Sequence, residues 1–129
     1  SKKRTLESIS HLLGDQMATL DGKELFNALI NREKLGSTGF GDGIAIPHCR
    51  LANCTQVTGA LVRLATAVDF DAIDQQPVDL LFVLLVPLQA TDEHLQILAT
   101  LATSFGKPEF RSNLREAADA RAMYQIAIA

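Results

Sequence analysis

The stretch LLFVLLV, residues Leu80–Val86, decides the fold of this chain of 129 residues. Every side chain in it is apolar, so no alternation separates a buried face from a solvated one. Its length suits a strand and falls far short of the roughly 20 apolar residues of a membrane-spanning helix. A strand that is apolar on both faces is typical of a sheet covered on both sides. The stretch therefore predicts a strand of an α/β sheet that is covered on both faces.

The segments on either side of this strand show the spacing of helices and shorter strands. Leu6, Ile9 and Leu13 recur at helical intervals, and Asp21 is placed to cap the helix that follows. The predicted elements, in order, are helices over residues 3–14 and 22–34, strands over 44–46, 57–64 and 80–86, a helix capped at Thr91 or Asp92 and ending at Gly106, and helices over 108–115 and 120–128. This order predicts helices packed on a central sheet and leaves the strand order open.

Composition excludes several classes of protein. The formal net charge is −3, which gives no electrostatic basis for binding nucleic acid. No apolar run is long enough to insert in a membrane, and no signal-peptide pattern is present, so we expect a cytoplasmic protein. Two cysteines, Cys49 and Cys54, do not make a disulfide scaffold, and reduced thiols are expected.

A glycine-rich loop delivers the histidine with the strongest chemical signal. Four glycines fall within residues 36–43, and Pro47 then restrains the backbone just before His48. Uncovered N–H groups of Gly41–Gly43 suit an anion, and an imidazole is a competent nucleophile near neutral pH. Asp42 within this loop has the character of a turn residue. Without further information, a structural turn followed by a structural histidine explains the same residues.

Four motifs resemble one family throughout the chain. They are REKLGSTG at residues 32–39, GFGDGIAIPHC at 39–49, FDAIDQQPVDLLF at 70–82, and EHL at 93–95. Together they resemble the fructose/mannitol-type enzyme IIA domains of the bacterial phosphoenolpyruvate-dependent phosphotransferase system. The first and third motifs are most similar to the nitrogen-regulatory branch of that family.

The resemblance implies a fold, a reaction and partners. It implies a single enzyme IIA type-2 domain over residues 1–129, with a short N-terminal segment trimmed, in which a mixed sheet carries helices on both faces. It implies a phosphotransferase that takes a phosphoryl group onto Nε2 of His48 from a histidine-containing phosphocarrier protein, without a cofactor or metal. Regulated targets in this branch include potassium-transport proteins and sensor kinases, bound according to the state of phosphorylation.

The resemblance also assigns roles to other residues. His94 corresponds to a second histidine near the active one and is expected to assist transfer from a helix N-terminus, where anions are favoured. Arg32 corresponds to an arginine close to the active histidine, where a guanidinium holds phosphate oxygens. Gly41, Asp42 and Gly43 are expected to bind phosphate. For Arg32, a solvated charge at a helix end is an equally good interpretation.

Two other functions compete with regulation. A free-standing IIA component for fructose or mannitol uptake would use the same chemistry, and the onward transfer of phosphate to a IIB domain distinguishes it. A remote alternative is a zinc-binding protein that uses His48, Cys49, Cys54 and His94, whose side chains are typical zinc ligands. Because side chains alternate along a strand, the adjacent His48 and Cys49 do not easily face one ion.

Overall fold

The computed structural model describes the chain apart from Thr91 and the side chain of Glu93. The described residues fall into two compact units, residues 1–90 and the part that follows to Ala129. The first unit contains a five-stranded mixed sheet and two helices, and the second contains three helices. The predicted α/β class with a mixed sheet is confirmed.

The predicted apolar stretch forms the central strand, β5 (Val78–Pro87). One edge of β5 pairs in parallel with β2 (Ile44–Ala45) and then with β3 (His48–Leu51). Its other edge pairs antiparallel with β4 (Thr58–Val68), and β1 (Gly39–Gly41) extends the sheet beyond β2. Both β2 and β3 keep the same register against β5, so they form one line along it that Ile46 and Pro47 interrupt.

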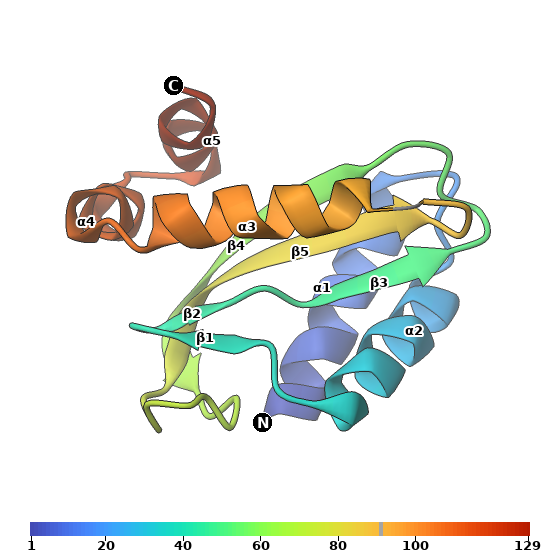
Figure 1. The fold of residues 1–129 in the computed structure, drawn as a ribbon, viewed down its shortest axis with the longest axis horizontal. Helices are drawn as coiled ribbons and strands as arrows, with labels where there is room; N and C mark the ends of the chain where they lie inside the picture. Colours follow the sequence, from blue (N-terminus) through green and yellow to red (C-terminus); the bar gives the residue numbers. More distant parts are fainter. Residues whose placement is uncertain (91) are drawn as a thin grey trace. The chain divides into compact units, whose positions relative to one another are not determined.

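Helices α1 (Lys2–Gln16) and α2 (Gly22–Leu35) pack against each other and against one face of this sheet (Figure 1). Their apolar stripes, including Leu6 and Leu29, join Leu81, Val83 and Leu85 of β5 in one buried core. On the opposite face of β5, Leu80, Leu84 and Val86 are buried as well. The strand is therefore buried on both faces, as its uninterrupted apolar sequence predicts.

The glycine-rich loop contains a hairpin that the sequence analysis did not predict. β1 and β2 are joined by Asp42 and Gly43, whose φ angles of 58° and 80° are those of a type I′ turn. An Asp-Gly pair favours this turn because both central residues need positive φ. Gly39 is required for a different reason, since a Cβ there would lie 2.8 Å from the Cβ and 2.9 Å from the Cα of Ala72.

The second unit consists of α3 (Glu93–Phe105), α4 (Pro108–Glu116) and α5 (Ala120–Ile128). Asp92 is the residue before α3 but makes no side-chain capping bond, and the alternative cap, Thr91, lies outside the described residues. Pro108 begins α4, as its fixed φ favours. All five predicted helices are confirmed, with ends that shift by one or two residues. In the part of the chain that the structure describes, no helix has the length and apolarity to span a membrane.

The close contact between β1 and Ala72 predicts an asymmetric response to two glycine substitutions. Gly39→Ala should lower the free energy of unfolding by about 1–3 kcal/mol, because the new methyl group meets Ala72 backbone that cannot rotate away. Gly36→Ala is the matched control: its φ of 164° is extended, and nothing lies within 4 Å of its added Cβ. Chemical denaturation of both variants measures the difference, and equal unfolding free energies would refute the packing of residue 72 on β1.

Candidate functional site

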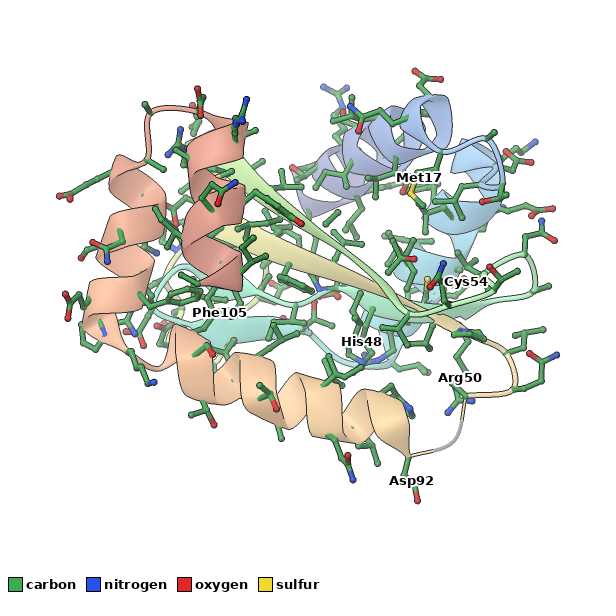
Figure 2. All side chains as sticks on the ribbon, turned by 90° about the horizontal axis from the view of Figure 1, so that it is seen from above. Met17, His48, Arg50, Cys54, Asp92 and Phe105 are labelled. Carbon is green, nitrogen blue, oxygen red and sulfur yellow. The ribbon has the colours of Figure 1, made fainter. Side chains whose placement is uncertain are left out.

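The line formed by β2 and β3 determines where His48 lies. His48 begins β3 and is in register with Leu84 of β5, so both side chains are on the face of the sheet opposite α1 and α2. The imidazole is half-buried. Pro47 has no N–H to donate. Its carbonyl accepts the N–H of Leu84 at 2.9 Å, and this bond holds the chain beside β5. The strand therefore presents one restrained imidazole on this face (Figure 2).

The hydrogen bond of Nδ1 determines which nitrogen of this ring carries the proton. Nδ1 of His48 lies 2.8 Å from the carbonyl oxygen of Ile46. A carbonyl oxygen only accepts, so Nδ1 carries the proton and donates it. In the neutral ring the lone pair is then on Nε2, which makes Nε2 the nucleophilic atom. Sequence alone did not identify the acceptor of the Nδ1 proton.

Arg50 is a candidate site residue that the sequence analysis did not consider. It follows His48 by two positions in β3, so its side chain leaves the same face of the sheet about 7 Å further along the strand. Its Nη1 donates to the carbonyl oxygens of Leu88, at 3.2 Å, and of Ala90. The alternation of side chains in a strand, applied to the sequence His48-Cys49-Arg50, was the signal that could have found it.

The structure does not bring the predicted phosphate-binding residues Gly41–Gly43 next to His48. These residues form the hairpin turn before β2, and His48 lies five residues from Gly43 along the same line, about 16 Å away. The N–H of Asp42 already donates to Oδ2 of Asp74 at 2.9 Å. This bond and a second one from Gln76 hold the pKa of the Asp74 carboxyl below its usual range. The Asp74 carboxylate thus already accepts the N–H of Asp42 at this turn.

The other predicted residues lie as follows. Arg32, in the last turn of α2, is half-buried and donates to the carbonyl of Gly36 at 2.8 Å, a contact that satisfies the end of its own helix. His94 is the second residue of α3, in the second unit, and is half-buried. Its placement at a helix N-terminus is confirmed, and its part in the reaction of His48 stays a prediction.

The cysteines are placed for packing rather than for chemistry. Cys49 is in register with Leu85, so it faces the buried core between the sheet and α1–α2, away from His48. Burial, together with the nearby Cys54, raises the pKa of the Cys49 thiol to about 12. A thiol that stays protonated is a poor nucleophile and a poor metal ligand. Among the described residues no group of three His, Cys, Asp or Glu side chains could hold a metal ion, which argues against the zinc alternative.

Known proteins resemble this chain over nearly its whole length. A nitrogen regulatory protein of Pseudomonas aeruginosa is 52% identical over 128 residues, which span 99% of this chain and 83% of that protein. The fructose-specific EIIA component of Haloferax volcanii is 38% identical over 117 residues, spanning 91% of this chain and 76% of that protein. The crystal structure of nitrogen regulatory protein IIA-Ntr from Neisseria meningitidis has a TM-score of 0.89 at 45% identity and covers 98% of this chain and 86% of that one.

The family model described as the phosphoenolpyruvate-dependent sugar phosphotransferase system, EIIA 2, matches residues 1–128. The match includes both units, the hairpin and the strand that carries His48. The chain therefore belongs to the EIIA 2 family of the phosphoenolpyruvate-dependent sugar phosphotransferase system.

Proposed function

We propose that this protein is a phosphocarrier of the nitrogen-regulatory branch and that it accepts a phosphoryl group on Nε2 of His48. The donor is a histidine-containing phosphocarrier protein. The observation that carries the proposal is the bond from Nδ1 of His48 to the Ile46 carbonyl, which leaves the nucleophilic lone pair on Nε2. The similarity to nitrogen regulatory proteins, at 52% identity for one of them, supports the branch.

The phosphoryl transfer needs neither a general acid nor a general base. The Nε2 lone pair of His48 attacks the phosphorus of the donor's phosphohistidine and forms a new N–P bond. The donor's own N–P bond breaks in line, and its electron pair returns to the donor's ring. The proton on Nδ1 stays in its bond to Ile46 throughout. That bond also stabilises the positive charge that the ring of His48 acquires as it is phosphorylated.

Cations near the three phosphoryl oxygens lower the barrier, because charge is spread over these oxygens in the transition state. We propose Arg50 for this role, since it extends from the same face of β3 as His48. We propose the same role for Arg32 because of the family resemblance. The guanidinium N–H groups that do not donate to the Gly36 carbonyl would bind the phosphoryl oxygens. His94, at the N-terminus of α3, is proposed on the family resemblance to assist transfer.

The proposed output is regulation. Phosphorylation of the half-buried His48 places negative charge on one face of the sheet, which makes or breaks a contact with a protein target. Potassium-transport proteins and sensor kinases are the proposed targets, from the family resemblance.

The specific observation that favours a sugar-specific IIA role is the fructose-specific relative, at 38% identity. Phosphate transfer from His48 to a sugar-specific IIB domain, with growth lost on that sugar alone after gene deletion, would establish it instead.

The first test concerns the acceptor. When the protein is incubated with phosphoenolpyruvate and the upstream phosphotransferase proteins, its intact mass should rise by one phosphoryl group, and the phosphate should be labile in acid. His48→Ala should abolish this gain. His11→Ala is the matched control, since His11 is an exposed histidine of α1, and it should be phosphorylated normally. Phosphorylation of the His48→Ala protein would show that another residue is the acceptor.

A second test concerns the proposed assisting residues. Arg50→Ala and His94→Ala should each slow phosphorylation of His48 by about tenfold or more, because each removes a side chain proposed to stabilise the transition state. Arg50→Lys should recover only part of the rate, since lysine lacks the bidentate fork. Arg4→Ala, at an exposed position of α1, removes the same charge and should leave the rate unchanged. Rapid-quench measurement of the phosphorylated fraction gives these rates, and rates for the Arg50 and His94 variants equal to that of the Arg4 control would remove both residues from the site.

A further inference from the structure

The fold buries the charged side chain of Glu33, which accepts hydrogen bonds from Lys2 and Thr38. The residue lies in the last turn of α2 and is 5% exposed. Its Oε1 accepts the backbone N–H of Thr38 at 2.9 Å and the ammonium of Lys2 at 3.3 Å, and its Oε2 accepts the hydroxyl of Thr38 at 2.7 Å. A buried carboxylate is costly to desolvate, so three strong contacts are needed to keep it there.

Thr38 connects this carboxylate to the strand that carries His48. The carbonyl of Thr38 accepts the N–H of Ile46 at 3.0 Å, and the carbonyl of Ile46 accepts the Nδ1 proton of His48 at 2.8 Å. Glu33, Thr38, Ile46 and His48 therefore form an unbroken series of hydrogen bonds. Within Thr38 and within Ile46, the covalent backbone connects one hydrogen bond to the next, so the series conveys position rather than a proton.

The segment between α2 and Thr38 is only two residues long. Its other hydrogen bonds hold Gly36 and Ser37: Arg32 donates to the Gly36 carbonyl at 2.8 Å, and the Ser37 hydroxyl donates to the Phe70 carbonyl. Gly36 and Ser37 are exposed, whereas Thr38 is buried. The helix itself is fixed by core residues such as Leu25 and Leu29, which are almost completely buried. Glu33 thus transfers the rigidity of a packed helix to Thr38 across a short exposed turn.

We propose that Glu33 is a positioning residue for His48, acting through Thr38 and Ile46 to fix the ring's tautomer and orientation. This inference rests on the proposed function, in which Nε2 of His48 is the reacting atom. Glu33 does not touch the imidazole. When its hold on Thr38 is weakened, the Ile46 carbonyl shifts, the bond to Nδ1 weakens, and the ring populates the tautomer whose proton is on Nε2. That tautomer cannot attack phosphorus through Nε2.

The test uses Glu33→Gln, which keeps the size of the side chain and one acceptor oxygen but removes the charge. Thr38→Val removes the hydroxyl that bonds Oε2 and keeps the branched shape, and Thr38→Ser keeps the hydroxyl as the matched control. In protein labelled with ¹⁵N at histidine, long-range ¹H–¹⁵N NMR spectra report the tautomer of His48 with no phosphoryl donor present. Backbone amide spectra confirm that each variant is folded.

The wild-type protein and Thr38→Ser should show His48 with its proton on Nδ1. Glu33→Gln and Thr38→Val should move both ring nitrogen shifts toward the averaged values of a free histidine. Phosphorylation of His48 in these two variants should slow by roughly tenfold, the scale expected when a reacting group loses its orientation. If Glu33→Gln does not fold, Thr38→Val decides.

Folded Glu33→Gln and Thr38→Val proteins with the wild-type tautomer would overturn the positioning role, because a purely structural role lowers stability without changing the ring. This outcome differs from failure of the proposed function. In that case wild-type His48 remains unphosphorylated while its tautomer still responds to the two substitutions.

Discussion

The hydrogen bond from Nδ1 of His48 to the carbonyl of Ile46 is the contact on which the proposed chemistry of this protein depends. This bond forms because the fold leaves the carbonyl of Ile46 available, at the point between β2 and β3 where the chain runs beside β5. The next carbonyl, of Pro47, accepts the Leu84 N–H, and the N–H of Ile46 pairs with Thr38 on the side away from β5. The apolar central strand β5 thus sets the backbone orientation, and the backbone in turn selects the tautomer that makes Nε2 nucleophilic.

The polar contacts around this bond serve geometry more than stability. A buried carboxylate such as Glu33 seldom stabilises a fold by more than apolar packing of the same volume would. Its value here is that it accepts two donors from one residue, Thr38, at 2.9 and 2.7 Å, and so fixes the turn before β1. The hairpin that follows is fixed separately, by positive φ angles and by the Asp74 carboxylate at Asp42. Different interactions therefore fix the two ends of β1: the bonds from Thr38 to Glu33 before it, and the turn at Asp42 with its bond to Asp74 after it.

Much of the fold follows from sequence pattern, and the exceptions have identifiable physical causes. The helices follow from apolar periodicity and capping residues, and the long strands follow from a continuous apolar run and from β-forming residue types, all of which are properties of local sequence. The hairpin over residues 39–45 was missed because its glycines were interpreted as an anion cradle, although Asp42-Gly43 is itself a strong turn signal. His48 was identified from its motif. Arg50 and the Ile46 acceptor depend on the strand that begins at His48, and a four-residue strand carries too little periodicity to be recognised.

The position of the phosphoryl group on the ring tests this account most directly. His48 of protein labelled with ¹⁵N at histidine can be phosphorylated enzymatically, and the coupling between phosphorus and nitrogen then identifies the bonded ring atom by NMR. Because the Ile46 carbonyl holds the proton on Nδ1, the account predicts a phosphorus bond to Nε2, with the Nδ1 proton still present and protected from rapid exchange. A phosphorus bond to Nδ1 would contradict it, since that nitrogen would have had to give up both its proton and its bond to Ile46.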